Sequence, residues 1–152
     1  MPNGWSGGAA LNNPEIVLDV HNDYLAIGAE MIASNTFATG RNVLEDAGVA
    51  DDFELCNRRA VELAIEARAK AGVDHVLVAG GISNWSFSGN RPSLETLYQN
   101  TIEQATIMRD AGADLLSLEM MVDLPRLGTT LDAVSSVGLP IWVGFTLSLI
   151  HI

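Results

Sequence analysis

A single carboxylate, Glu119, stands at the end of an apolar stretch and is the residue of this chain best placed for chemistry. It follows Leu115, Leu116 and Leu118, a run typical of a buried strand. A carboxylate in this position can accept charge-assisted hydrogen bonds from a cationic group of a ligand. We therefore take Glu119 as the centre of a candidate binding site; the alternative is an ordinary surface residue at a strand end.

A second group of polar side chains ends another apolar run. Ser34, Asn35 and Thr36 follow the short apolar segment 31–33. Their hydroxyl and amide groups are suited equally to contacting a substrate and to capping the end of a strand through its backbone. Farther along, Gly80 and Gly81 are expected to shape the floor of a loop, because paired glycines permit close backbone approach.

The histidines and the cysteine are poor candidates for a metal site. His21 lies in a predicted helix with no cysteine or acidic residue at ligand spacing, so we expect a packed imidazole. His75 begins a strand, at the rim opposite to Glu119. Cys56, the only cysteine, is expected to be a small core residue. One cysteine excludes an internal disulfide and a closed cysteine-rich zinc site built from this chain alone.

Helices and strands alternate along the chain, and these elements must position the polar groups. Apolar residues at helical spacing predict helices over residues 14–27 and 53–71, from Ser93 to a stop at Gly112, and from Asp123 to a stop at Gly138. Continuous apolar runs predict strands over residues 30–37, 74–83, 114–120 and 140–146. Asn13 is predicted to cap the first helix, and residues 1–11 and 38–52 are predicted to be loops.

This alternation predicts an α/β fold of right-handed βαβ units in a parallel sheet. Two architectures satisfy it, a doubly wound sheet and part of an eight-stranded barrel. No glycine-rich G-x-G-x-x-G fingerprint follows a strand, which disfavours a nucleotide-binding doubly wound sheet. Polar residues at the carboxyl ends of the strands favour the barrel, since barrel active sites lie on that face. The sequence therefore favours a partial (β/α)8 TIM barrel.

The charge balance and the apolar runs restrict the partners. The chain has 8 Lys+Arg against 19 Asp+Glu, a formal net charge of −11, which disfavours nucleic acid and anionic membrane surfaces. The longest apolar run, residues 139–150, is interrupted by polar and glycine residues and is shorter than the ~20 residues of a membrane helix. With no recognisable secretory signal, we expect a cytoplasmic protein.

Several short blocks, taken in order, resemble the amino-terminal half of the homocysteine S-methyltransferase family. Each block is weak alone, and their shared order and spacing make the resemblance specific. The blocks are Trp5-Ser, Asn13-Pro-Glu-Ile-Val17, His21 with Tyr24-Leu25, Gly28-Ala29, Ser34-Asn-Thr-Phe37, Ala60-Val-Glu-Leu-Ala64, Val78-Ala-Gly-Gly-Ile-Ser83, Ala111-Gly-Ala-Asp-Leu-Leu116 with Glu119, and Pro140-Ile-Trp-Val-Gly-Phe-Thr146.

The resemblance implies a (β/α)8 barrel that transfers a methyl group to the sulfur of homocysteine, giving methionine, with zinc held by three cysteines. The metal is needed because a free thiol, with a pKa of ~8.5, is mostly protonated at neutral pH, and a metal ion converts it into a thiolate. The resemblance also implies that Glu119 binds the substrate ammonium and that Ser34, Asn35 and Thr36 line the pocket. The implied partners are homocysteine and a small methyl donor.

Trp5 bears on the identity of that methyl donor. In the betaine-using branch of the family, a tryptophan at this place joins tyrosines that enclose a quaternary ammonium through cation–π contacts. Here Ala38 and Met120 stand at the matching tyrosine positions, so S-methylmethionine or another donor is at least as consistent as betaine. Trp5 is then either a substrate contact or a residue that packs a loop against the barrel mouth.

Two parts of the family pattern are missing. The Asp-Gly-Gly motif of the first strand would precede Trp5, and the zinc cysteines would follow Thr146. We therefore expect residues 1–146 to be a partial homocysteine-binding barrel domain, strands two to five, that binds no zinc and is inactive alone. Residues 147–152 are expected to be a non-native tail. Open sheet edges favour pairing with another chain, which leaves a homo-oligomer open.

Two other interpretations stand beside this one. The chain could be the homocysteine-binding module of a cobalamin-dependent methionine synthase, in which the same barrel receives the methyl group from a different carrier. It could also be an inactive truncated product that binds nothing.

Overall fold

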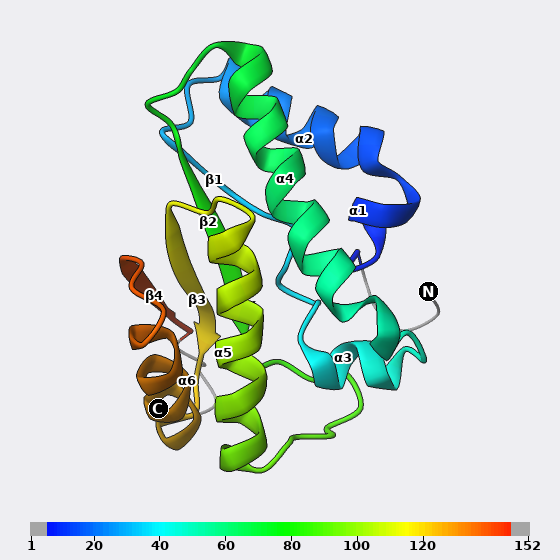
Figure 1. Ribbon diagram of the computed structural model, residues 1–152, viewed down its shortest axis with the longest axis vertical. Helices are drawn as coiled ribbons and strands as arrows, with labels where there is room; N and C mark the ends of the chain where they lie inside the picture. Colours follow the sequence, from blue (N-terminus) through cyan, green and yellow to red (C-terminus); the bar gives the residue numbers. More distant parts are fainter. Residues whose placement is uncertain (1–5, 147–152) are drawn as a thin grey trace.

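The computed structural model describes residues 6–146 as a parallel sheet with helices between its strands (Figure 1). The helices in chain order are α1 (Ala9–Asn12), α2 (Pro14–Ala26), α3 (Arg41–Asp46), the 3-10 helix η1 (Ala50–Asp52), α4 (Phe53–Ala71), α5 (Leu94–Asp110) and α6 (Leu124–Ser135). The strands are β1 (Met31–Ala33), β2 (Leu77–Ser83), β3 (Leu115–Met121) and β4 (Ile141–Phe145). No helix within residues 6–146 is long and apolar enough to cross a membrane.

The strands lie side by side in the order of the sequence, β1-β2-β3-β4, and every pairing is parallel. Ile32 pairs with Val78, and Gly81 pairs with Ser117. Each crossover between neighbouring strands contains a long helix, which is the βαβ arrangement expected from the sequence. The parallel α/β prediction is confirmed.

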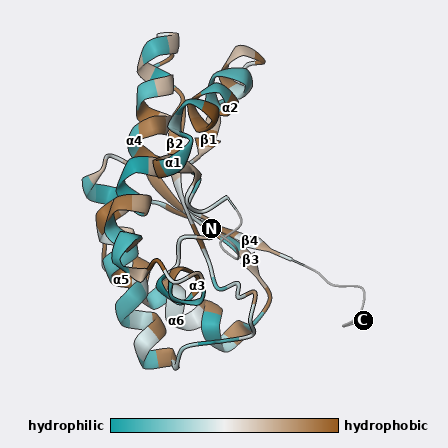
Figure 2. Ribbon diagram, turned by 90° about the vertical axis from the view of Figure 1, so that its right-hand side faces the viewer, coloured by the Kyte–Doolittle hydropathy of each residue, from teal (hydrophilic) through white to brown (hydrophobic). Residues whose placement is uncertain are grey.

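The two faces of the sheet differ in what covers them. Val78, Ile82, Leu116 and Leu118 face the helices and pack with Met108 of α5 in one buried core. The alternate residues point to the other side, which we call the inner face. There Leu77 is 42% and Trp142 is 54% exposed. Figure 2 shows α4 and α5 along one face of the sheet.

Several expectations about the local structure were wrong. Residues 9–12 and 41–46 form α1 and α3 within segments expected to be loops, because helices of four to six residues are too short to show a hydrophobic period. Asn13 makes no side-chain capping bond; its backbone N–H instead bonds to Ala9 O and closes α1. Ser93 and Asp123 do cap α5 and α6.

The first strand is also shorter than the predicted range 30–37. β1 ends at Ala33, and Ser34–Thr36 leave the regular strand geometry while staying bonded to β2, since the Ser34 N–H donates to Ala79 O at 2.8 Å. Trp5 and the expected tail, residues 147–152, lie outside the described residues.

Candidate functional site

Glu119 lies near the carboxyl end of β3, on the inner face, and pairs in register with Ser83 of β2. Its carboxyl group rests over the backbone of Gly81. A Cβ placed on Gly81 would come within 2.6 Å of Glu119 Oε1. The glycine in the neighbouring strand therefore makes the space that the carboxylate occupies.

The Glu119 carboxylate has no partner among residues 6–146, since none of them forms a hydrogen bond or an ion pair with it. The side chain is half-buried, and this burial raises the pKa of the carboxyl because it disfavours the charged form. A partly desolvated carboxylate without a partner gains free energy when a cationic donor reaches it. The geometry thus suits the binding of an ammonium group.

Thr36 meets Glu119 at the same glycine. Its Oγ1 would lie 3.3 Å from a Cβ on Gly81, and it bonds to the Gly81 peptide twice: it donates to Gly81 O at 2.8 Å and accepts from Gly81 N at 3.0 Å. Ser34 Oγ lies 2.9 Å from the same hydroxyl oxygen. Thr36 is fully buried, and these bonds fasten the end of β1 to β2, which fits a capping role. The predicted substrate contacts of Ser34 and Thr36 stay predictions.

Asn35 points away from this group toward the amino-terminal segment. Its Nδ2 donates to Ser6 O at 2.7 Å, and Ser6 Oγ donates back to Asn35 Oδ1 at 3.2 Å. Ser34 and Asn35 border a mainly apolar pocket of about 570 Å³ between α2 and β1, and His21 also lines it. The structure therefore brings Thr36 to Glu119, links Ser34 to them through Thr36, and places Asn35 at the edge of the sheet.

His21 is packed, as predicted from the sequence. It is buried, and burial lowers the pKa of its imidazole, so the ring is neutral at pH 7. Its Nε2 has no hydrogen-bond partner among the described residues.

The backbone directly after Glu119 is distorted, a feature that the sequence did not reveal. Met120 has φ +54, in the left-handed region, which costs a non-glycine residue roughly 1–2 kcal/mol. The pairing of β3 with β4 shifts register between Leu118 and Met121, as at a β-bulge. The shift returns Met121 to the buried core and leaves Met120 exposed at the rim. Bulges beside functional sites re-aim side chains, but methionine carries no sequence signal for one.

The profile of the homocysteine S-methyltransferase family matches residues 2–150. The chain belongs to that family. Homocysteine S-methyltransferase 1 from Arabidopsis thaliana is 25% identical over 166 residues, which are 93% of this chain and 51% of the relative. Selenocysteine methyltransferase from Astragalus bisulcatus is 27% identical over 174 residues, 93% of this chain and 52% of the relative. The chain thus spans about half the length of these two relatives.

A crystal structure of a homocysteine methyltransferase has the same fold. The homocysteine methyltransferase MmuM from Escherichia coli, in its metallated form, superposes with a TM-score of 0.81 at 24% identity. The superposition covers 94% of this chain and 55% of MmuM. The predicted partial (β/α)8 barrel is confirmed.

The residues of this chain do not fit the zinc site that the resemblance implies. Three cysteine ligands are impossible in a sequence with one cysteine. Cys56 is fully buried, and burial together with the nearby Asp52 carboxylate raises its pKa to about 11. Within residues 6–146, no three His, Cys, Asp or Glu side chains are grouped to hold a metal ion. The family's metal therefore has no ligand set among the residues described.

Proposed function

We propose that this chain is the amino-terminal part of an enzyme that transfers a methyl group to homocysteine, and that Glu119 binds the ammonium group of that amino acid. In the reaction the sulfur forms a bond to the methyl carbon while the bond from that carbon to the donor breaks and its electron pair stays on the donor, and the thiol proton passes to solvent. Glu119 fixes the amino acid end and so sets where the sulfur lies.

One observation carries the proposal, the unpartnered Glu119 carboxylate on the inner face beside Gly81. It is half-buried, its pKa is raised by burial, and it stands at the carboxyl end of a parallel strand, where barrel enzymes bind their substrates. A bound ammonium would supply the hydrogen-bond donors that the carboxylate lacks, and would favour its charged form.

Activation of the thiol is assigned to sequence outside this chain. We propose that the complete enzyme uses zinc for it, since several relatives are named for the same thiol methylation and one crystal structure is described as metallated. The donor is a small methylated molecule, and a cobalamin-dependent partner domain stays an alternative source of the methyl group. A lone unpaired cysteine fits a reducing cytoplasm.

Titration of L-homocysteine into this chain, followed by calorimetry or by backbone NMR shifts, tests the assignment. Glu119→Gln should weaken binding at least about tenfold, because a charge-assisted hydrogen bond is lost. Glu45→Gln is the matched control, since Glu45 is an exposed carboxylate distant in the chain from the site, and it should leave the affinity unchanged.

A second ligand separates the ammonium from the rest of homocysteine. The analogue 4-mercaptobutyrate keeps the thiol and the carboxylate but lacks the amine, so it should bind weakly and equally to the native chain and to Glu119→Gln. If the native chain and Glu119→Gln bind homocysteine with equal affinity, Glu119 does not bind the ammonium group. Absence of any saturable binding would favour the inert truncated product instead.

A further inference from the structure

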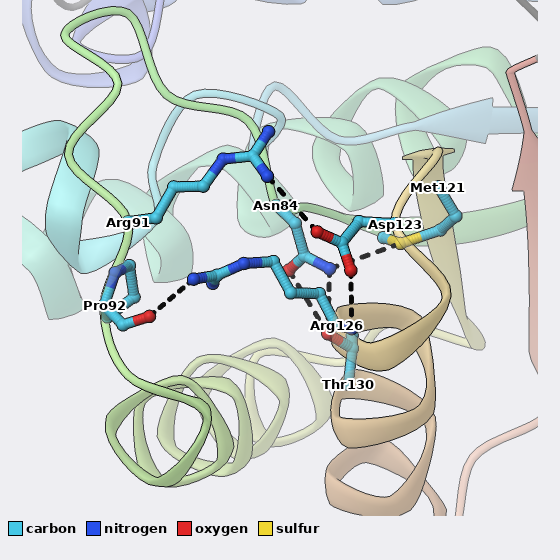
Figure 3. Close-up of polar contacts among 7 residues, drawn as sticks. All are labelled: Asn84, Arg91, Pro92, Met121, Asp123, Arg126 and Thr130. Atoms are coloured by element: carbon cyan, nitrogen blue, oxygen red, sulfur yellow. Dashed lines mark hydrogen bonds and ion pairs between the residues drawn. The ribbon is translucent and has the colours of Figure 1, made fainter. Parts of the chain in front are cut away.

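A second polar site lies at the same rim, between the carboxyl ends of β2 and β3 (Figure 3). It is a pocket of about 50 Å³, and it is lined by Asn84, Trp85, Arg91, Met120, Val122, Asp123 and Arg126. Met120, which directly follows Glu119, forms part of its wall. The space suits a carboxylate-sized group, because a cavity of ~10–15 Å³ already holds one water.

Hydrogen bonds hold the walls of this pocket in place. Asn84 exchanges hydrogen bonds with Thr130 Oγ1 at 3.1 and 3.2 Å, and its Nδ2 also reaches Met121 Sδ at 3.5 Å. Asp123 Oδ1 accepts from the backbone N–H of Arg126 at 3.1 Å. These bonds tie the segment after β2 to α6, so the pocket belongs to a fixed part of the rim.

Arg126 is the unusual member of the group. Every other arginine of the described residues forms an ion pair with a carboxylate. Arg126 instead donates one hydrogen bond to Pro92 O at 2.6 Å (Figure 3) and has no carboxylate partner within residues 6–146. In a chain with a net charge of −11, a half-buried arginine whose guanidinium is bonded to no carboxylate is exceptional, and the nearest acid in the pocket, Asp123, bonds to the Arg126 backbone N–H and to Arg91 instead. A guanidinium has five N–H donors in a planar fork that matches a carboxylate.

The position of Arg126 strengthens its attraction for an anion. It lies in the first turn of α6, a 12-residue helix with no acidic residue in that turn. A cation is disfavoured there, because the amino end of a helix is already positive. The guanidinium and the helix end therefore add their positive potentials at the pocket, offset in part by the Asp123 carboxylate that caps the helix, and a bound anion would interact favourably with both.

We propose that this pocket binds the carboxylate group of a substrate. Arg126 is the main hydrogen-bond donor, and Arg91, which pairs with Asp123 in the absence of a ligand, is a second cation that can turn to the bound carboxylate. Arg91 NH1 lies 3.3 Å from Asp123 Oδ2 and is largely exposed, so it can turn to a ligand at little cost. The inference rests on the proposed function, since it treats this rim as the substrate-binding face. Two substrates carry such a group, homocysteine and an onium methyl donor that is itself an amino acid or a betaine.

The test begins with sodium acetate, the carboxylate alone, titrated into the ¹⁵N-labelled chain with sodium chloride at equal ionic strength as the reference. The Arg126 Nε–H signal and the backbone N–H signals of Asp123, Leu124 and Arg126 should shift saturably with acetate only. Arg126→Gln should weaken acetate binding at least about tenfold. Arg58→Gln is the control, because it removes an equal charge from an exposed helical ion pair.

Asp123→Asn gives a test that a merely structural role of Arg126 would not pass. Asparagine can still cap α6, while loss of the carboxylate frees Arg91 and removes a negative charge from the pocket. Acetate should then bind about fivefold more tightly. This variant also decides the matter if Arg126→Gln fails to fold.

Paired ligands then separate the two substrates. Two pairs of ligands are compared, and in each pair the second compound lacks only the carboxylate: glycine betaine with tetramethylammonium, and homocysteine with 3-aminopropanethiol. If Arg126→Gln abolishes the difference in affinity within one pair, the carboxylate-bearing compound of that pair is the ligand that occupies the pocket. Acetate shifts that stay outside residues 84–92 and 120–126, or an Asp123→Asn variant with unchanged acetate affinity, would overturn the proposal. Neither result depends on Glu119 or on homocysteine binding, so the proposed function would stand or fall separately.

Discussion

Replacement of Gly81 by alanine should separate ligand binding from stability in this site. The added Cβ would meet Glu119 Oε1 at 2.6 Å and would approach Thr36 Oγ1 to 3.3 Å. Ordinary contacts begin at 3.4 Å, so the carboxyl must move by about 0.8 Å, whereas the threonine needs only a slight shift. The substitution thus acts almost entirely on the position of the Glu119 carboxylate.

The cost in folding free energy should be small. The Glu119 carboxyl is at the end of a flexible side chain, and it loses no hydrogen bond within residues 6–146 when the side chain rotates. Gly81 does not have a positive φ, so alanine fits the backbone and gains roughly 0.4–1 kcal/mol from the unfolded state. We expect the free energy of unfolding in urea to change by less than about 1 kcal/mol.

The cost in binding should be large. A displaced carboxylate loses its charge-assisted bond to the ammonium, which corresponds to an about 10-fold to 100-fold increase in the Kd for homocysteine. Gly144→Ala is the matched control, because Gly144 lies on the inner face of β4 and its added Cβ would make only a 3.4 Å contact with Leu118 O. A Gly81→Ala chain that binds homocysteine within twofold of the native affinity would refute the reasoning.

Three further predictions concern stability and reactivity. Burial raises the pKa of Glu119 above its value in the unfolded chain, so protonation of Glu119 stabilises the fold at low pH, and this stabilisation is lost as the pH rises through the raised pKa. Glu119→Gln should therefore increase the free energy of unfolding in urea by ~0.5–2 kcal/mol at pH 7 and leave it unchanged near pH 3. An equal increase at both pH values would contradict this prediction. Cys56, with a pKa of about 11, should react with iodoacetamide at pH 8 far more slowly in the native chain than in urea, and equal rates would contradict its burial. Asp114→Ala should cost roughly 2–4 kcal/mol in thermal or urea unfolding, because Asp114 Oδ2 accepts from Arg68 at 2.6 Å and from the Val78 N–H at 2.8 Å; a loss below 0.5 kcal/mol would show that water replaces both bonds.

The sequence predicted the large elements of the fold because their signals are local. α4 has the predicted range 53–71, and Ser93 and Asp123, where the next two helices were predicted to start, cap α5 and α6. Helices of 12 to 19 residues repeat their apolar face several times, and glycines with positive φ, such as Gly72, end them clearly. α1 lacks both signals, and α3, although Gly48 with positive φ follows it, is too short to repeat an apolar face.

The candidate site was predictable only in part. Glu119 stood out because a charge interrupts an apolar run, and that signal is independent of the fold. The contact between Glu119 and Gly81 depends on the register of β2 with β3, which pairs residues 36 positions apart, Ser83 with Glu119, and no local pattern encodes it. The sequence also did not show that the Arg126 guanidinium has no carboxylate partner among residues 6–146, because Asp123 stands only three residues away and in the structure bonds to the Arg126 backbone instead.

The order of the strands has a consequence for how the chain is made. Since the strands lie in the sheet in the order in which they are synthesised, each new strand finds its partner already outside the ribosome. β2 can pair with β1, and β3 with β2, without waiting for any later residue, and the intervening helices close each step over a short stretch of chain. Assembly can therefore proceed vectorially during translation at ~5–20 residues per second. On that path the growing sheet has one newly formed unpaired edge at a time, and each arriving strand pairs with the edge that the previous strand left exposed.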